Sequence, residues 1–235
     1  MNNATLSLAG ANLVPLPSGA LWWASEKLLA VSDLHLGRSE RAARYGNGLL
    51  PPYETRDTLD RLALAVSQTQ PRTILSLGDS FDDLEAAGAV QDEVIERLAS
   101  LAAGRKWIWI AGNHDPGPVD LPGTHLSEHR SGRLIFRHIA DPAHRPGDGG
   151  EVSGHYHPKA RLWLRGSHIA RPCFLSDAAR VILPAFGTYT GGLEMTNPAF
   201  DELLDPESIA WLTGRQITRL PRRTGAAIAA PGARR

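Results

Sequence analysis

Three short apolar runs in the first half of the chain most constrain what this sequence can fold into. They occupy residues 28–31, 73–77 and 107–110. Continuous apolar runs of this length suit strands that are buried on both faces. Between them lie two segments with helical spacing of apolar residues, near 54–66 and 90–101. This alternation predicts an α/β fold in which parallel neighbouring strands are joined by right-handed crossovers.

The rest of the chain is richer in short strand-like runs. Those of the second half lie at 134–136, 161–164, 173–175 and 181–183 and are divided by turn residues. We expect them to form a second sheet that packs on the first. Residues 5–23 alternate and then turn at 15–19, which indicates a hairpin or two short antiparallel strands at a sheet edge.

Length and composition favour one folded unit. A chain of 235 residues with 42% hydrophobic content can bury one sizeable core, so we expect a single domain over residues 1–220. Residues 221–235 are basic and contain no acidic residue or apolar periodicity. They are therefore predicted to form a disordered basic tail.

Charge and cysteine content limit the partners and the compartment. Lys+Arg and Asp+Glu both number 25, so no global charge attracts nucleic acid or a membrane. No apolar run approaches the roughly 18 residues that a membrane span requires. Cys173 is the only cysteine, which excludes an internal disulfide, and the first residues lack a signal-peptide pattern. A cytoplasmic protein is expected.

Polar motifs follow the apolar runs in a fixed order. They are Asp33-Leu34-His35, Gly78-Asp79, Gly112-Asn113-His114-Asp115, His138 and Gly154-His155-Tyr156-His157. Each motif alone is common among turn residues at strand ends. The carboxyl ends of parallel strands, however, meet at one edge of an α/β sheet, so the ordered set predicts that these side chains converge.

The spacing of these residues suits a centre with two metal ions. Asp33 and His35 stand two apart in a segment expected to be extended, so both can chelate one ion, and His155 and His157 repeat this spacing. Asp79, on a tight turn after a buried strand, is the natural bridging carboxylate. Two ions roughly 3.5–4 Å apart can clamp the attacking and leaving oxygens of a phosphoryl displacement. The imidazole, carboxylate and amide donors suit Mn²⁺, Fe, Ni²⁺ or Zn²⁺.

Three assignments have competing interpretations. His125, His129 and His144 lie in the same stretch as His138, which we favour because it directly follows the apolar run 134–136. Arg38 follows the first motif and is a candidate phosphate ligand, although surface arginines need no function. Asp82 could orient a metal ligand, although carboxylates are common at helix N-termini.

The ordered motifs resemble those of the calcineurin-like metallophosphoesterases over about residues 28–158. The resemblance implies a four-layer α/β/β/α sandwich of two mixed β-sheets flanked by helices. It implies one ion, with Mn²⁺ the leading candidate, on Asp33, His35, Asp79 and His157, and a second on Asp79, Asn113, His138 and His155. It also implies a metal-bridging hydroxide as the nucleophile, His114 as the group that protonates the leaving oxygen, and Asp115 as the residue that orients His114.

The flanking segments resemble a narrower family, the bacterial ligase-associated DNA damage response endonucleases, also called PdeM. The segments concerned are the short insert after His35-Leu36-Gly37 and residues 171–174, 183–187 and 189–193. This resemblance implies a cytoplasmic, metal-dependent phosphodiesterase or nuclease that cleaves DNA during repair. It also implies an ATP-dependent DNA ligase, a helicase and an exonuclease as companions.

Two other functions stay open. One is a small-molecule or lipid-precursor enzyme such as a UDP-diacylglucosamine pyrophosphatase, which would need a groove for acyl chains. The other is a non-catalytic scaffold, which would be expected to lack a ligand or the catalytic histidine. Arginines concentrated near the C-terminus raise a further hypothesis, that this segment is a DNA-binding arm. The alternative is a solvated extension without a function. The arginines are Arg215, Arg219, Arg222, Arg223, Arg234 and Arg235.

Overall fold

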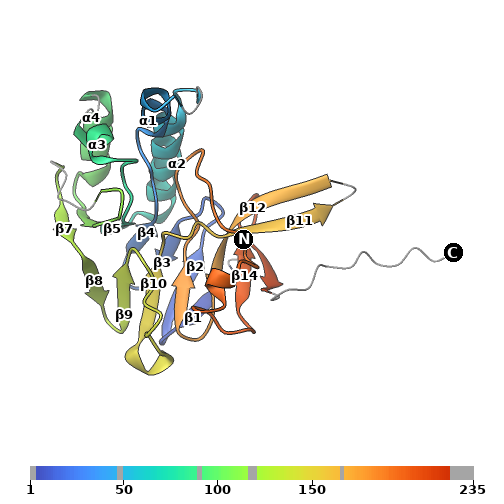
Figure 1. Ribbon diagram of the computed structural model, residues 1–235. Coiled ribbons are helices and arrows are strands. Elements are labelled where there is room, and N and C mark those ends of the chain that lie inside the picture. The colour runs from blue at the N-terminus through green and yellow to red at the C-terminus, as the bar shows by residue number, and fades with distance from the viewer. Residues whose placement is uncertain (1–3, 47–49, 89–91, 116–120, 165–166, 223–235) are drawn as a thin grey trace.

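Two mixed β-sheets pack face to face in the computed structural model of this chain, and helices cover the outer face of one of them (Figure 1). The structure describes residues 4–46, 50–88, 92–115, 121–164 and 167–222. This arrangement confirms the predicted α/β fold class with two packed mixed sheets.

The first sheet combines an antiparallel half with a parallel half. Its strands lie side by side in chain order: β1 (Leu6–Leu8), β2 (Ala11–Pro15), β3 (Leu21–Trp23), β4 (Leu28–Val31), β5 (Thr73–Leu77), β6 (Lys106–Ile110) and β7 (Thr124–Leu126). Pairing is antiparallel from β1 to β4 and parallel from β4 to β7. The three apolar runs therefore became the central parallel strands, as predicted, and the N-terminal segment forms three edge strands.

The α-helices of the described residues are α1 (Arg38–Arg44), α2 (Glu54–Thr69), α3 (Leu84–Gly88) and α4 (Asp92–Ala102). Helices α2 and α4 pack against this first sheet, and the shorter α1 and α3 lie beside them. The crossover helix α2 buries Leu59, Leu62 and Val66, the stripe that the sequence predicted, and α4 buries Leu98. These side chains form one hydrophobic cluster with Trp107 of β6. Both predicted helices are confirmed, whereas α1 was not predicted.

The second sheet holds the remaining strands. They are β8 (Glu128–Ser131), β9 (Leu134–Arg137), β10 (Gly150–Ser153), β12 (Ser167–Ser176), β13 (Arg180–Ile182), β14 (Ile209–Leu212) and β15 (Thr218–Pro221), in the spatial order β15-β14-β12-β13-β10-β9-β8. Strands β9, β10 and β13 run parallel. Strand β11 (Lys159–Leu164) pairs with β12 in a hairpin that projects from the body of the molecule (Figure 1).

Two apolar layers hold the second sheet in place. Between the sheets, Leu75 and Ile108 share one buried cluster with Phe136 and Phe174. On the outer face of the second sheet, Phe200 at the end of the 3-10 helix η2 (Pro198–Phe200) packs with the turn after it and with Cys173. A second 3-10 turn, η1 (Pro146–Asp148), lies between β9 and β10. Burial raises the pKa of the Cys173 thiol to about 12, as expected for a packed residue.

Two residues beyond the predicted boundary at residue 220 are part of the folded chain. Pro221 ends β15, and Arg222 is only 1% exposed. Its guanidinium donates to Ser208 Oγ at 2.8 Å and to Asp201 Oδ1 at 2.9 Å. The rest of the predicted basic tail, residues 223–235, lies outside the described residues.

Within the described ranges, no helix combines the length and the apolar character that crossing a membrane requires.

Candidate metal centre

The predicted ligands meet where strands of both sheets end. Asp33 and His35 follow β4, Asp79 follows β5 and Asn113 follows β6, whereas His138 follows β9 and the pair His155 and His157 follows β10. Two groups could each hold an ion: Asp33 with His35 and His157, and Asp79 with His138 and His155. Within each group the ligand atoms lie within 4.8 Å of one another.

The backbone around these ligands is unusual. Asp33, His35, Asp79, His155 and His157 all adopt positive φ, between 46° and 69°. Side-chain-bearing residues rarely adopt this region, which costs of order 1–3 kcal/mol per residue and recurs at functional sites. The expectation that Asp33 and His35 lie in an extended segment is therefore wrong. Left-handed turns bring both side chains to one group instead.

The carboxylate of Asp33 is held in place within the first group by several neighbours. Its Oδ1 lies 3.1 Å from His157 Nε2, and its Oδ2 accepts the amide of His155 at 3.0 Å and the hydroxyl of Ser32. Burial works against ionisation of Asp33, yet the hydrogen bond and charge of His157 hold its pKa below the usual value. The role of Ser32 was not predicted; its place between a buried strand and Asp33 was the only available signal.

Asp82 orients His35, the role that the sequence analysis considered for it. Its Oδ1 lies 2.8 Å from His35 Nδ1, which leaves Nε2 facing Asp79 Oδ2 at 4.0 Å. Burial opposes ionisation of Asp82, but His35 and the guanidinium of Arg38 lower its pKa to about 2. The guanidinium of Arg38 lies 3.0 Å from the same carboxylate, and that of Arg41 lies 3.1 Å from it. The structure thus places Arg38 beside the centre, bound to Asp82.

The second group converges on one nitrogen of His138. Its Nδ1 lies 2.8 Å from the Leu77 carbonyl oxygen, which can only accept, so Nδ1 carries a proton, and in the neutral ring Nε2 offers a lone pair. Around Nε2 lie Asn113 Oδ1 at 2.9 Å, His155 Nδ1 at 3.3 Å and Asp79 Oδ2 at 3.4 Å. Four potential ligand atoms that face one another in this way are typical of a metal site.

Asp79 lies between the two groups. Its Oδ2 faces His35 Nε2 of the first group and His138 Nε2 of the second, and its Oδ1 accepts the backbone amide of His114 at 2.9 Å. Burial raises the pKa of Asp79, but His138 and the other surrounding donors lower it well below its usual range. An ionised carboxylate in this position can serve both groups at once.

The predicted pairing of Asp115 with His114 is wrong. Asp115 is buried, and its carboxylate accepts the backbone amides of Ser80, Phe81 and Gly112 at 2.7–3.2 Å. The carbonyl oxygen of Asp82 instead lies 2.9 Å from His114 Nδ1. Burial and the charge of Asp79 raise the pKa of Asp115 to about 6. Asp115 therefore fixes the two ligand loops together and does not touch the His114 ring.

Two glycines make room for this packing. Gly78 has a φ of +77°, and a Cβ there would lie 2.5 Å from the His138 ring. A Cβ at Gly112 would lie 2.1 Å from Asp79 Oδ1. The glycines of the Gly-Asp and Gly-Asn motifs are thus required by close approach as well as by the turn.

Unpartnered buried atoms test whether these residues fit a metal. His35 Nε2 is buried and makes no hydrogen bond, and the buried atoms Asp33 Oδ1 and His157 Nε2 lie 3.1 Å from each other. Buried polar atoms normally have a partner, and an ion between these three atoms would supply one. Their donor types match the borderline-hard set that divalent transition metals prefer. The residues therefore fit a metal.

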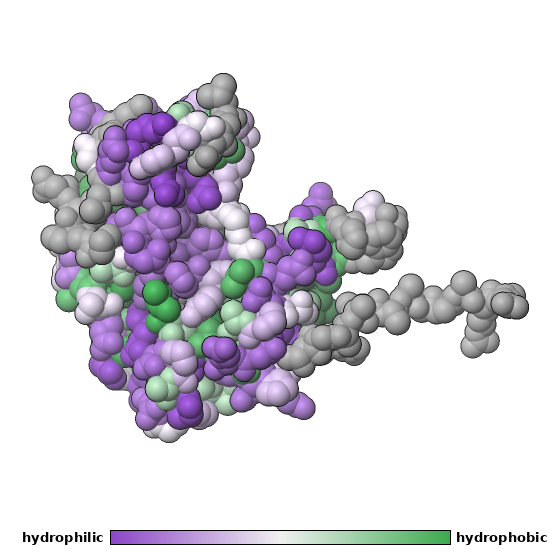
Figure 2. All heavy atoms as spheres, viewed as in Figure 1, coloured by the Kyte–Doolittle hydropathy of each residue, from purple (hydrophilic) through white to green (hydrophobic). Residues whose placement is uncertain are grey.

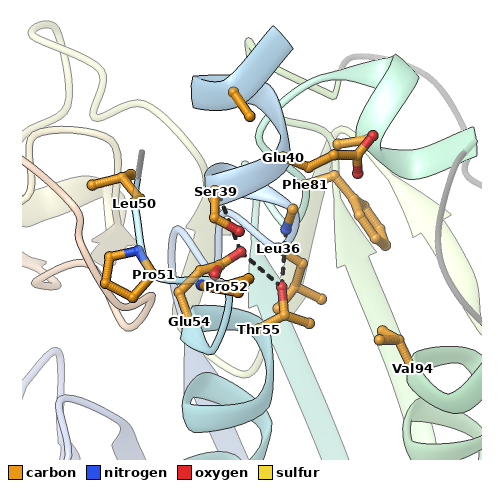
Figure 3. Close-up of a pocket in the computed structure, with 13 residues that line it drawn as sticks. Leu36, Ser39, Glu40, Leu50, Pro51, Pro52, Glu54, Thr55, Phe81 and Val94 are labelled. Carbon is orange, nitrogen blue, oxygen red and sulfur yellow. Dashed lines mark hydrogen bonds between the residues drawn. The ribbon is translucent and has the colours of Figure 1, made fainter. Parts of the chain in front are cut away.

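One large cavity is separate from these ligands. It measures about 870 Å³ and lies where α1, the start of α2, and the segments around Phe81 and Val94 meet (Figure 3). Apolar side chains dominate its lining, and Glu54 accepts the amide of Ser39 at 3.2 Å at its edge. None of the predicted ligands lines it.

Comparison with known proteins gives one family and one close structural likeness. The family model described as calcineurin-like phosphoesterase matches residues 26–183. The crystal structure of the nuclease MPE from Pseudomonas putida is 26% identical, with a TM-score of 0.72, over 93% of this chain and 100% of that chain. The phosphoesterase Yfce from E. coli is 15% identical, with a TM-score of 0.42, over 83% of this chain and 99% of that one. No curated protein matches the chain.

Proposed function

Since the chain belongs to the calcineurin-like phosphoesterase family, a family of phosphoric ester hydrolases, we propose that it is a binuclear metal-dependent nuclease acting on phosphodiester bonds in DNA. One observation carries the proposal: Asp79 faces both ligand groups at a single point between the two sheets. The likeness to the nuclease from Pseudomonas putida, which extends over the whole of that chain, favours nucleic acid as the substrate.

Seven side chains would hold the ions. The first ion would bind Asp33, His35, Asp79 and His157, and the second Asp79, Asn113, His138 and His155, with Mn²⁺ the leading candidate. When bound, such a pair supplies a water-derived nucleophile at neutral pH and neutralises charge on the phosphoryl group. Asp82 and the Leu77 carbonyl oxygen orient His35 and His138, so the donor nitrogens face inward before any ion arrives.

His114 is suited to protonate the leaving oxygen. Its Nδ1 proton is donated to the Asp82 carbonyl oxygen, which leaves Nε2 at 4.0 Å from Asp79 Oδ2 and facing the ligands. Its side chain is 32% exposed, so a substrate can reach it. A proton carried on Nε2 would pass to the oxygen released from phosphorus, after which the neutral ring remains hydrogen bonded to the carbonyl.

A metal-swapped assay tests the proposal. Purified protein loaded with Mn²⁺, Fe²⁺, Ni²⁺ or Zn²⁺ would be given a chromogenic bis-ester, the matching mono-ester and single-stranded DNA. We expect bis-ester hydrolysis to exceed mono-ester hydrolysis and DNA to be cut. Hydrolysis of the mono-ester alone would contradict the proposal.

A second candidate has one observation in its favour. The apolar cavity beside α1 offers space that an acyl chain could fill, which a lipid-precursor pyrophosphatase of the same family would need (Figure 3). Adding an acylated nucleotide pyrophosphate to the same panel separates the two functions. Preference for that compound over DNA and the bis-ester would support the second candidate.

The cellular setting that we propose follows from the flanking segments. Their resemblance to the ligase-associated endonucleases favours a cytoplasmic role in DNA repair beside a DNA ligase, a helicase and an exonuclease. Co-purification of the tagged chain with such a ligase under native conditions would test this setting.

A further inference from the structure

A groove of about 390 Å³ lies beside the metal centre and has no role so far. It is enclosed by the turn 17–19, by the first residue of β11, by the neighbouring part of β12, and by the segment 185–190 that follows β13. Much of its wall comes from the flanking segments that carried the narrower family resemblance, among them Arg171, Pro172 and Tyr189. These segments are therefore brought together in space.

The wall of the groove is built partly from residues next to the metal centre. Gly187 in its wall donates its amide to the Asp33 carbonyl oxygen at 3.0 Å. Lys159 in the same wall stands two residues after His157. The groove wall is therefore tied to the segments that carry two of the predicted ligands, Asp33 and His157.

Positive charge is exposed in this groove without a neutralising carboxylate. Its lining includes Arg61, Lys159 and Arg171 and contains no acidic residue. Arg61 is neutralised by Asp57 at 3.1 Å. The ammonium of Lys159 donates to the Thr190 carbonyl oxygen at 2.7 Å, and neither it nor the exposed Arg171 has a carboxylate partner among the described residues.

A second groove, which borders the second ligand group, differs in this respect. It measures about 320 Å³ and is lined by Asn113, His138 and Arg137, among others. The guanidinium of Arg137 lies within 3.3–3.6 Å of carboxylates of Glu128, Asp141 and Glu151. Its charge is thus balanced, so uncompensated positive charge lies on the Lys159 side.

Aromatic rings lie at the same place. Tyr189 lines the groove, and its ring centroid lies 5.6 Å from that of Tyr53, which is 54% exposed. Tyr189 adopts a φ of +63°, a rare conformation for a bulky residue, so the surrounding structure holds its ring in place. Aromatic faces beside a cationic groove are the usual combination for a polynucleotide strand, since bases stack on the rings while phosphates contact the cations.

We propose that this groove binds the phosphates of the substrate strand that neighbour the scissile one, through Lys159 and Arg171, with the Tyr53–Tyr189 pair offering a ring face to a base. The inference rests on the proposed nuclease function and adds to it the path of the strand. It predicts that affinity rises with oligonucleotide length and falls with salt, because each phosphate contact releases counterions.

Binding of a fluorescent oligonucleotide, followed by anisotropy over a range of salt concentrations, tests the inference. Lys159→Gln and Arg171→Gln should each lower the slope of log affinity against log salt by about 0.7, and the double variant by about 1.4. Arg171→Lys should restore most of the slope. Arg161→Gln is the matched control, because this arginine belongs to the same hairpin but pairs with Glu194 at 2.7 Å and does not line the groove.

Kinetics with two substrates give an independent readout. The ratio of kcat/KM for the oligonucleotide to kcat/KM for the bis-ester should fall in the Lys159 and Arg171 variants and stay at the wild-type value in Arg161→Gln. Wild-type salt slopes and ratios in the folded double variant would overturn the strand path, even if the bis-ester is hydrolysed. Absence of any diester hydrolysis by the wild type would instead overturn the proposed function, and the salt slopes would still decide whether the groove binds a strand.

Discussion

Asp79 is the residue on which both ligand groups depend. Its carboxylate faces His35 on one side and His138 on the other, so Asp79→Ala removes the one negative charge that both ions would share. We expect bis-ester hydrolysis to drop to the background rate and metal content, measured by elemental analysis, to fall. Asp60→Ala, on the surface of α2, is the control. Two retained ions with near-normal turnover would show that Asp79 is not the bridge.

His114 separates chemistry from metal binding. Its ring is held by the Asp82 carbonyl oxygen and belongs to neither ligand group, so His114→Ala should keep the metal content. The rate should fall by roughly 10²–10⁴, the usual contribution of general acid catalysis. Esters with very good leaving groups should lose less, and His125→Ala should lose nothing. Loss of both ions in His114→Ala would make this residue a ligand instead.

At the scale of elements, one contact ties α2 to the segment that walls the groove. Asp57 accepts hydrogen bonds from Thr188 and from Arg61, and the Thr188 hydroxyl is the main reason that the pKa of Asp57 is lowered. A carboxyl with a lower pKa in the folded state stabilises the protein above its unfolded value, near pH 3.9. That contribution is lost as the pH falls through the folded-state pKa.

Asp57→Asn should therefore destabilise the protein at pH 7 and not at very low pH. Because the carboxylate is half exposed, solvent screening limits the loss to up to about 1 kcal/mol. Urea unfolding of the wild type and the variant at pH 7 and in acid measures the difference. Asp60→Asn on the same helix should give a smaller change. A difference that grows as the pH falls would contradict the assigned sign.

The helices and strands that could be predicted from the sequence are those with a clear apolar pattern. Strands β4, β5 and β6 were found because each is a continuous apolar run, and α2 because Leu59, Leu62 and Val66 form a stripe. Helix α1 buries no residue, and most of its side chains are charged, so it has no apolar stripe from which a helix could be predicted. Its arginines instead pair with Asp82 and Asp83 from the loop after β5, on a hydrophilic part of the surface (Figure 2).

The candidate ligands could also be predicted from the sequence, but the contacts around them could not. Residues with metal-binding side chains stand in recognisable motifs, and strand ends bring them together. The partners of Asp115 are backbone amides, which every residue carries, so no sequence signal distinguishes them from a side-chain partner. The left-handed turns at Asp33 and His35 could not be predicted either, because neither residue is a glycine, the residue that usually signals a positive φ.

At the scale of the whole molecule, Arg222 determines how far the chain can be truncated from its C-terminus without loss of stability. Its buried guanidinium bonds to Ser208 and Asp201, so a chain that ends at residue 220 should lose about 1–3 kcal/mol of stability. A chain that ends at residue 222 should unfold at the wild-type temperature. Thermal unfolding of the two truncated chains checks this expectation, and equal melting temperatures would contradict it.

The chain that ends at residue 222 also tests the hypothesis of a DNA-binding arm. It lacks Arg223, Arg234 and Arg235 but keeps the folded arginines, so each lost phosphate contact should lower the salt slope by roughly 0.7–0.9. Hydrolysis of the bis-ester should not change. Wild-type DNA affinity and salt slope in this truncated chain would leave partner docking as the remaining function of these residues.

The division of the ligands between two sheets also sets an order of events during synthesis. Asp33, Asp79 and Asn113 belong to the sheet that leaves the ribosome first, whereas His138, His155 and His157 belong to strands made later. The second group is complete only when residue 155 has emerged, and the first only when residue 157 has emerged, and both require the second sheet to have docked. On the proposed function, ion capture would therefore be a late step of maturation, and a nascent chain released before that point would lack a complete ligand group.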